Sequence, residues 1–204
     1  CSSPSMWTTK WYARTPESVA DEIEFYVRSL GANNFPFQDL TAILKRDWII
    51  EFCNELKRRE LNVTWQFPSG TRCEVIDDEV ARLLNETGGR SLALAPESGS
   101  ERTRKLIQKR MKTESLLDAC KASVKAGLNV TTFTVIAFPH DTAEDLADTV
   151  KLARRLGRIG IDDCAVGFFF PIPNTQLYKE LMEKGKVTHE DDFLLTPIFA
   201  NEEK

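Results

Sequence analysis

The stretch Val130-Thr131-Thr132-Phe133-Thr134-Val135-Ile136-Ala137-Phe138 decides how this chain folds. Its β-branched and aromatic residues make it the clearest β-strand of the sequence. Thr142 follows as a helix cap, and the residues after it predict a helix to about Leu156. The stretch therefore predicts one strand followed by one helix, the unit from which parallel sheets are built.

The same alternation repeats on both sides of this unit. Further strands are predicted at residues 33–38, 63–67, 91–95 and 165–170. Pro36 keeps the first of these strands brief, and Pro68 is expected to end the second. Helices are predicted at residues 16–30, 48–56, 77–86, 113–126 and 176–183, with a short one that begins between residues 99 and 104.

Strands that alternate with helices of about 10 to 15 residues imply parallel βαβ units with right-handed crossovers. The five units are too few for a closed eight-stranded barrel, and the sequence has no glycine-rich dinucleotide motif and no P-loop. Two architectures remain open: a doubly wound open sheet or part of a barrel. In both of them, ligands bind at the carboxyl ends of the strands.

The composition predicts one soluble globular domain. The 204 residues are 42% hydrophobic and carry 27 basic and 31 acidic side chains, a net charge of −4. This balance lacks the excess of basic residues that is typical of proteins that bind nucleic acid or an anionic membrane. No apolar run approaches the roughly 20 residues of a spanning helix, and no signal peptide opens the chain. We therefore expect a cytoplasmic protein with a small-molecule partner.

The five cysteines, at positions 1, 53, 73, 120 and 164, form no local metal or redox motif. None of them lies in a CxxC pair, and their odd number argues against a disulfide framework. The only two histidines, His140 and His189, have no nucleophile motif beside them, so no conventional catalytic set is predicted. Because the sequence starts on Cys1 rather than on methionine, we expect it to be cut from a longer one.

The predicted strand ends carry polar side chains that suit a small zwitterionic ligand. Asp39 follows the first strand, Arg72 the second, and Glu97 with Ser98 the third. Arginine and the backbone N–H groups of a turn at a helix start bind carboxylates, and acids bind ammonium or ribose hydroxyl groups. Turn and capping roles explain the same residues without a ligand, so both interpretations stay open at this point.

Several short motifs follow one another in a fixed order. They are Cys1-Ser2-Ser3-Pro4-Ser5, Phe37-Gln38-Asp39-Leu40-Thr41, Glu97-Ser98-Gly99-Ser100, Gln108-Lys109-Arg110, Phe138-Pro139-His140-Asp141-Thr142 and Pro171-Ile172-Pro173-Asn174-Thr175. In this order and spacing, residues 1–183 resemble radical S-adenosylmethionine (radical SAM) enzymes. In that family a CxxxCxxC loop precedes such motifs, and Cys1 resembles its third cysteine.

The resemblance implies an α/β fold, a partial (β/α)6 barrel of the TIM type over residues 1–184, with residues 185–204 as a peripheral tail. The second to sixth βα units would be present and the first strand missing. The resemblance also implies an enzyme in which a 4Fe-4S cluster reductively cleaves S-adenosylmethionine. The resulting 5′-deoxyadenosyl radical would modify a small-molecule substrate, and an external electron donor would reduce the cluster.

Motif positions imply a set of residues that bind S-adenosylmethionine. They are Asp39, Arg72, Glu97, Ser98, Lys109, Phe138 and Pro139. The acids would face its ammonium group or ribose, the basic groups and Ser98 its carboxylate, and Phe138 with Pro139 would flank its adenine. Cys1 would be a metal ligand, the last of three cysteines of which the chain lacks two, so the chain as it stands is expected to be inactive.

The sequence departs from the family pattern at one strand end. His140-Asp141 replaces the Gly-Glu of the family's Gly-Phe-Pro-Gly-Glu-Thr motif, and Ala137 replaces its first glycine. The run Trp65-Gln66-Phe67-Pro68-Ser69-Gly70-Thr71-Arg72 is most similar to members that carry a cobalamin-binding domain ahead of the barrel, among them enzymes resembling anaerobic magnesium-protoporphyrin ester cyclases. Cobalamin, bound by such an upstream domain, is therefore a further expected cofactor.

Two alternatives compete with the radical SAM interpretation. One is a non-radical α/β module that binds phosphate or another small anion at the turn formed by residues 97–100. The other is an interaction scaffold whose exposed first-strand edge pairs with another chain, which would also produce oligomers.

Overall fold

The computed structural model describes residues 10–39 and 41–188. Five strands form one sheet in the order β1-β2-β3-β4-β5, and every neighbouring pair is parallel. The strands are β1 (Asn34–Pro36), β2 (Thr64–Thr71), β3 (Gly89–Glu97), β4 (Asn129–Ile136) and β5 (Asp163–Phe168). The predicted parallel α/β fold is therefore confirmed.

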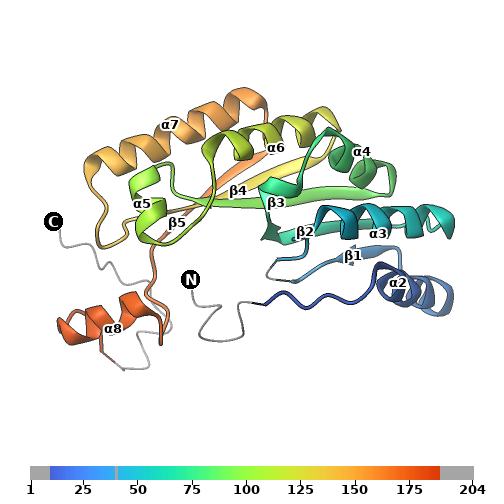
Figure 1. Cartoon of the computed structure of the whole chain (residues 1–204), viewed down its shortest axis with the longest axis horizontal. Coiled ribbons are helices and arrows are strands. Elements are labelled where there is room, and N and C mark those ends of the chain that lie inside the picture. The colour runs from blue at the N-terminus through green and yellow to red at the C-terminus, as the bar shows by residue number, and fades with distance from the viewer. Residues whose placement is uncertain (1–9, 40, 189–204) are drawn as a thin grey trace.

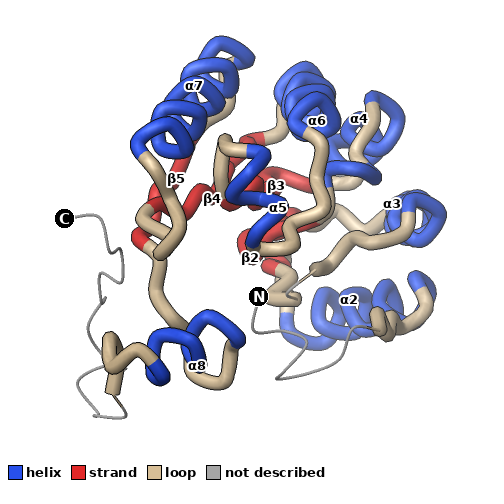
Figure 2. Tube along the Cα trace, turned by 60° about the vertical axis from the view of Figure 1, so that its left-hand side comes forward, coloured by secondary structure: helices blue, strands red, loops and turns tan. Residues whose placement is uncertain are grey.

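Helices connect these strands in chain order. They are α2 (Pro16–Leu30), α3 (Arg46–Arg58), the 3₁₀ turn η1 (Cys73–Val75), α4 (Asp78–Glu86), α5 (Glu101–Leu106), α6 (Thr113–Lys125), α7 (Ala143–Ile159) and α8 (Gln176–Glu183). Figure 2 shows α2, α3, α4, α6 and α7 as an arc outside the curved sheet, with α8 on its open side. This arrangement is that of a barrel opened along one side, which favours the barrel over the flat open sheet.

Local capping chemistry explains why several helix ends agree with the sequence predictions. Thr15 accepts a hydrogen bond from the Ser18 N–H at the start of α2, and Gly31 ends that helix with φ +66°. Thr142 and Asp145 form a reciprocal capping box at the start of α7. Because these signals act within four residues, they can be read without knowledge of the tertiary structure.

The main core lies between the sheet and the outer helices. Trp65 and Phe67 of β2 pack edge to face at 5.2 Å between ring centroids, and Phe52 of α3 meets Trp65 at 5.4 Å. All three side chains are at most 2% exposed. Burial of each such side chain contributes about 1.5–3 kcal/mol to folding, so this aromatic cluster fixes α3 on the sheet.

Two strands run further than their sequences predict. The expectation that Pro68 ends β2 is wrong, because the strand continues to Thr71 with a register shift between Phe67 and Thr71. Gly70, at φ +101°, supplies the backbone conformation of that irregularity. β3 likewise continues past Ala95 to Glu97, with a second register shift. These bulges depend on the neighbouring strand, which no local pattern reveals.

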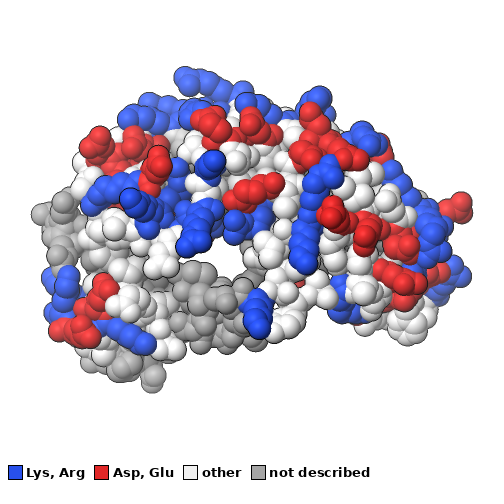
Figure 3. Space-filling view, in the orientation of Figure 1, with Lys and Arg blue, Asp and Glu red and all other residues white. Residues whose placement is uncertain are grey.

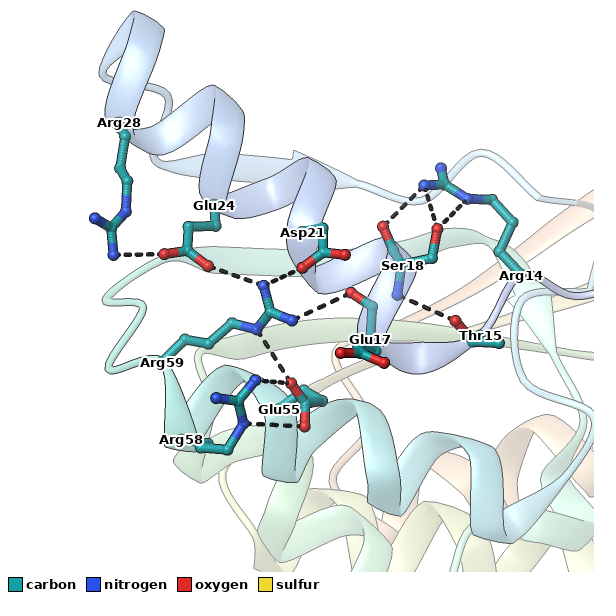
Figure 4. A network of polar contacts seen from close by, with 10 residues as sticks. All are labelled: Arg14, Thr15, Glu17, Ser18, Asp21, Glu24, Arg28, Glu55, Arg58 and Arg59. Carbon is teal, nitrogen blue, oxygen red and sulfur yellow. Dashed lines mark hydrogen bonds and ion pairs between the residues drawn. The ribbon is translucent and has the colours of Figure 1, made fainter.

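The side chain of Arg59 joins α2 to α3 (Figure 4). Its guanidinium group donates hydrogen bonds to the carboxylates of Asp21 at 2.6 Å, Glu24 at 2.8 Å and Glu55 at 3.1 Å. The Arg59 side chain is only 7% exposed. The hydrogen bond with Asp21, together with those to the two glutamates, raises the pKa of Arg59 above its ordinary value despite burial. Arg59 therefore stays charged and holds three acids together.

Replacing Arg59 with Met should lower the free energy of unfolding by about 2 kcal/mol, because the three carboxylates would then repel one another without a cation between them. Urea unfolding followed by circular dichroism measures the change. Arg58→Met is the matched control: Arg58 is 62% exposed and pairs only with Glu55, so its loss should change stability by less than about 0.5 kcal/mol. Equal effects of the two changes would contradict the assigned role of Arg59.

In the described part of the chain, no helix has the length and apolar character needed to cross a membrane. The cytoplasmic location and the boundary at residue 184 stay predictions. Among the residues just after that boundary, Val187 packs against the small apolar cluster of α8.

Candidate functional site

The carboxyl ends of the parallel strands bring most of the predicted site residues to one edge of the sheet. α5 and the start of α7, which follow β3 and β4, lie at this edge (Figure 1). Glu97 ends β3 and Ser98 follows it, and Phe138 with Pro139 lie just after β4. This edge is where parallel α/β folds bind their ligands.

Arg72, Glu97 and Lys109 gather around the loop between α5 and α6. The Lys109 Nζ lies 3.2 Å from the Glu97 Oε1, and each side chain is about one-third exposed, 31% and 30%. Arg72 pairs with both carboxylate oxygens of Glu74, at 3.0 and 3.1 Å, and reaches the Arg110 carbonyl at 3.5 Å. The hydrogen bond with Glu74 raises the pKa of Arg72. The Lys109–Glu97 and Arg72–Glu74 ion pairs therefore lie side by side, partly exposed to solvent.

Basic side chains crowd the same region. Within eleven residues of α5 and the following loop lie Arg102, Arg104, Lys105, Lys109, Arg110 and Lys112. Figure 3 shows Lys and Arg side chains along the upper rim of an opening beneath the sheet. A chain with a net charge of −4 thus gathers basic side chains along this segment, where Arg102 pairs with Asp145 and Lys109 with Glu97.

Ser98 is turned into the protein. Its side chain is buried, its hydroxyl lies 3.3 Å from the Thr149 hydroxyl of α7, and it accepts a hydrogen bond from the Ser100 N–H at 3.1 Å. The Gly99 N–H also bonds to Thr149, at 3.0 Å. In this arrangement Ser98 shapes the turn after β3. Its direct contact with a ligand stays a prediction.

Phe138 and Pro139 lie at the end of β4. Phe138 is buried, with its ring 5.0 Å from that of Phe169 and stacked on that of His140 at 5.7 Å. Its backbone N–H is held by the Asp141 carboxylate at 3.0 Å. Pro139 is half-buried in the same loop. Phe138 therefore belongs to the apolar cluster that packs against α8, and the Asp141 carboxylate fixes its backbone.

Asp39 follows β1. It is exposed and lines a cavity of about 530 Å³ beside β1, together with Arg14, Glu22 and Trp48. None of the other predicted ligand residues lines that cavity. The described structure therefore brings Arg72, Glu97 and Lys109 together around one loop, whereas Asp39 lines the cavity beside β1.

The described residues do not form a site for an iron–sulfur cluster. Cys1 lies outside them, and no three histidine, cysteine or acidic side chains of the described chain are placed to hold a metal ion. Cys53, Cys73 and Cys120 are buried, and burial raises their pKa values to about 11, 12 and 12. These three thiols therefore stay protonated at neutral pH, whereas cluster ligands are thiolates.

Asp145 is a site residue that the sequence did not single out. Its buried carboxylate accepts hydrogen bonds from the Ser100 hydroxyl at 2.5 Å and from the Thr142 N–H at 2.9 Å, and it pairs with Arg102. Burial alone would raise its pKa, but the hydrogen bonds from Ser100 and Thr142 and the charge of Arg102 outweigh it and lower the pKa to about 2. Asp145 thus fastens the turn after β3 to the start of α7.

A second link joins the same two loops. The Thr103 hydroxyl of α5 donates to the Asp141 carboxylate at 2.8 Å, and Asp141 in turn accepts from the Phe138 N–H. Arg104, also buried, donates to the Ser98 carbonyl at 2.8 Å and to the Thr113 hydroxyl at 2.8 Å. The only sequence signal for these links is the density of Ser, Thr and Asp after both strands. The partners lie up to 51 residues apart.

Four residues in or beside the site motifs adopt left-handed backbone conformations. Ala137 has φ +63°, Glu97 +66°, Gln108 +59° and Asn174 +66°. This region is costly for residues with a Cβ, and such strain concentrates at functional sites. Ala137, which stands where the resembling family motif has glycine, therefore carries this strain.

Changing Ala137 to Gly should raise the free energy of unfolding by about 1 kcal/mol, because glycine adopts a φ of this sign without steric cost. Chemical unfolding measures the gain. Ala147→Gly is the control, and its effect on stability should have the opposite sign. Ala147 is exposed within α7, so glycine there should lower the free energy of unfolding by about 1 kcal/mol. A loss of stability in both variants would exclude strain at position 137.

The fold and this edge define a parallel α/β protein whose charged side chains gather at the carboxyl ends of its strands. The chain belongs to the radical SAM superfamily, whose family model matches residues 1–153. It is 27% identical over 179 residues to an uncharacterised methyltransferase of Pyrococcus horikoshii, covering 88% of this chain and 38% of that protein. It is 26% identical to the anaerobic magnesium-protoporphyrin IX monomethyl ester cyclase of Rubrivivax gelatinosus, covering 97% of this chain and 36% of the cyclase. The chain thus spans less than two-fifths of each relative.

Solved structures of cobalamin-dependent radical SAM enzymes share the fold. TsrM of Kitasatospora setae, with cobalamin and a [4Fe-4S] cluster bound, matches with a TM-score of 0.67 and 16% identity over 84% of this chain and 32% of TsrM. OxsB with aqua-cobalamin and S-adenosylmethionine bound matches with a TM-score of 0.65 and 15% identity over 94% of this chain and 28% of OxsB. These similarities confirm the fold that the motif order predicted.

Proposed function

We propose that this chain is the S-adenosylmethionine-binding part of a radical SAM enzyme that modifies a small-molecule substrate. The observation that carries the proposal is the Glu97–Lys109 pair, with Arg72 beside it, at the carboxyl edge of the sheet. Two ion pairs, Glu97–Lys109 and Glu74–Arg72, in one partly exposed place suit a ligand with an ammonium and a carboxylate group. Family membership supports the same ligand.

Each residue has a distinct part in this proposal. Glu97 binds the ammonium group or the ribose hydroxyls, while Lys109 and Arg72 bind the carboxylate. Phe138 and Pro139, which follow β4, flank the adenine. Asp39 approaches the ligand from the side of β1, where it is exposed. The chain's own residues thus bind and orient the cofactor.

The iron–sulfur cluster needs ligands beyond the described residues. When bound, a 4Fe-4S cluster supplies the electron for reductive cleavage of S-adenosylmethionine to the 5′-deoxyadenosyl radical. We propose an external electron donor for the cluster and, from the cobalamin-dependent neighbours, cobalamin as a further cofactor. The part of the described residues is limited to binding S-adenosylmethionine and holding it in one orientation.

Isothermal titration of the chain with S-adenosylmethionine tests the binding proposal. Binding should be detectable and should weaken about tenfold in Glu97→Gln and in Lys109→Gln, since each change removes a charge-assisted hydrogen bond. Arg155→Gln is the control, because Arg155 pairs with Glu114 between α6 and α7, away from the proposed ligand residues. Anaerobic reconstitution with iron and sulfide, dithionite reduction and measurement of 5′-deoxyadenosine test the activity.

Other binding results would favour different functions. Binding of inorganic phosphate but not of S-adenosylmethionine, lost in Ser100→Ala, would favour an anion-binding module. No binding of either ligand, or equal binding by all variants, would contradict the proposal.

We also propose that the open edge of β1 pairs with a strand of another chain. The Asn33 carbonyl and the Phe37 N–H bond to β2, at 2.8 and 2.9 Å, so the alternate residues Asn34 and Pro36 direct their backbone groups to the open side. Pro36 lacks an N–H, which suits an edge strand. The molecular mass in sedimentation equilibrium should then rise with protein concentration. A constant monomer mass would contradict this contact.

A further inference from the structure

Arg104 of α5 is a buried cation without an acid partner. It is 4% exposed, and its guanidinium group donates hydrogen bonds to the Ser98 carbonyl at 2.8 Å, the Gly99 carbonyl at 3.1 Å and the Thr113 hydroxyl at 2.8 Å. In the described part of the chain, no carboxylate forms an ion pair with it. Burial lowers the pKa of Arg104 and the charge of Glu101 acts in the opposite direction, but arginine stays protonated in proteins. Because a buried charge is costly unless it is compensated, these three hydrogen bonds hold the guanidinium group in one place.

The contacts of Arg104 reach both members of the Glu97–Lys109 ion pair. The two carbonyls that its guanidinium group holds belong to the residues directly after Glu97. Its own backbone carbonyl accepts a hydrogen bond from the Lys109 N–H at 2.8 Å. Thr113, its third side-chain partner, is the first residue of α6, which follows the loop that carries Lys109. One residue therefore fixes the backbone beside the acid, beside the base and at the end of their loop.

The backbone that Arg104 holds is strained at two points. Glu97 has φ +66°, and Gln108, which directly precedes Lys109, has φ +59°. Residues with a Cβ keep such conformations only where the surrounding structure holds them. The hydrogen bonds of Arg104 lie next to both strained residues, so they supply part of that restraint.

We propose that Arg104 is a positioning residue, which holds Glu97 and Lys109 at the spacing that receives the ammonium and carboxylate groups of S-adenosylmethionine. The inference rests on the proposed function. Arg104 is enclosed and acts on the ligand through these two side chains. The position needs arginine, because the planar guanidinium fork donates to two carbonyls and a hydroxyl at once, whereas the single ammonium group of lysine lacks that geometry.

Titration with S-adenosylmethionine tests the proposal. Arg104→Met keeps the apolar stem and removes every donor, so its affinity should fall about tenfold. Arg104→Lys keeps the charge without the fork and should lose about three- to tenfold. Arg82→Met is the matched control and should bind like the unchanged chain, because Arg82 is 56% exposed and pairs with Glu86 on α4.

Circular dichroism melting shows which variants fold. If Arg104→Met does not fold, Arg104→Lys and Thr113→Val carry the comparison. Thr113→Val keeps the shape of the side chain and removes one of the three acceptors of Arg104. Its affinity should fall about threefold.

A double-mutant cycle with Lys109→Gln supplies a readout that a merely structural role would not move. If Arg104 acts through the ion pair, Arg104→Met should cause little further loss of affinity once Lys109 is glutamine. Losses that multiply in the double variant, or an unchanged affinity in Arg104→Met, would overturn the inference while the proposed function stands. If the unchanged chain does not bind S-adenosylmethionine, both are overturned.

Discussion

Replacing Gly99 with Ala is expected to lower the free energy of unfolding by about 3 kcal/mol or more, since overpacking against rigid backbone is among the costly substitutions. A Cβ at Gly99 would lie 2.3 Å from the Asp148 carbonyl oxygen and 2.4 Å from the Thr149 Cα. Both atoms belong to the backbone of α7, which cannot move aside like a flexible side chain. The turn after β3 and α7 would have to separate.

Thermal unfolding of the two proteins checks this expectation. For a chain of about 200 residues, a loss of 3 kcal/mol corresponds to a fall in Tm of about 6–12 °C. Gly157→Ala is the matched control on the same helix, because no heavy atom lies within 4 Å of a Cβ there. That change should raise stability by about 0.5–1 kcal/mol. An unchanged Tm in Gly99→Ala would mean that the turn does not press on α7.

The close approach at Gly99 also explains the Glu-Ser-Gly-Ser motif physically. Gly99 permits the contact with α7, Ser98 and Ser100 bond across it, and Glu97 is left at the ligand edge with φ +66°. Ser98, Gly99 and Ser100 thus position the turn, and Glu97 forms the ion pair with Lys109. Gly99→Ala should therefore weaken S-adenosylmethionine binding as well as stability.

The elements of the fold that could be predicted are those with local causes. α8 was predicted at residues 176–183 and is found at Gln176–Glu183, because Thr175 caps it and apolar spacing marks its buried side. The end of β2 was wrongly placed at Pro68, because the bulge that carries the strand to Thr71 is set by pairing with β3. Strand ends of this kind are decided by partners distant in the sequence.

The same distinction applies to the site. The rule that ligands meet the carboxyl ends of parallel strands indicated Arg72 and Glu97, and the resemblance added Lys109, which lies 3.2 Å from Glu97 in the structure. It could not separate side chains that face the edge from those that support it. The Ser98 hydroxyl lies beside that of Thr149, 51 residues away in the sequence. The role of Asp145 follows only from its contacts with Ser100 and Arg102. Long-range hydrogen bonds leave no periodic signal in a sequence.

Asp145→Asn is expected to lower the free energy of unfolding by about 3 kcal/mol, because it removes a buried anion that satisfies several donors. The amide nitrogen of asparagine would face the Ser100 hydroxyl or the Thr142 N–H, both of which donate to the carboxylate now. Arg102 would also lose its buried partner. Urea unfolding at pH 7 measures the loss. Asp148→Asn is the control on the same helix, since Asp148 is 39% exposed and its side chain pairs only with Lys151.

The pH dependence of stability distinguishes the charge of Asp145 from its shape. The pKa of Asp145 is about 2 in the folded protein, against about 3.9 for aspartate in an unfolded chain. Its carboxylate therefore contributes about 2 kcal/mol that is fully present above about pH 5 and is lost as the pH falls from 4 through 2. The stability difference between the unchanged protein and Asp145→Asn should shrink over that range. A difference that stays constant from pH 7 to pH 2.5 would show that shape alone matters, and would remove the ionised carboxylate as the group that joins the two loops.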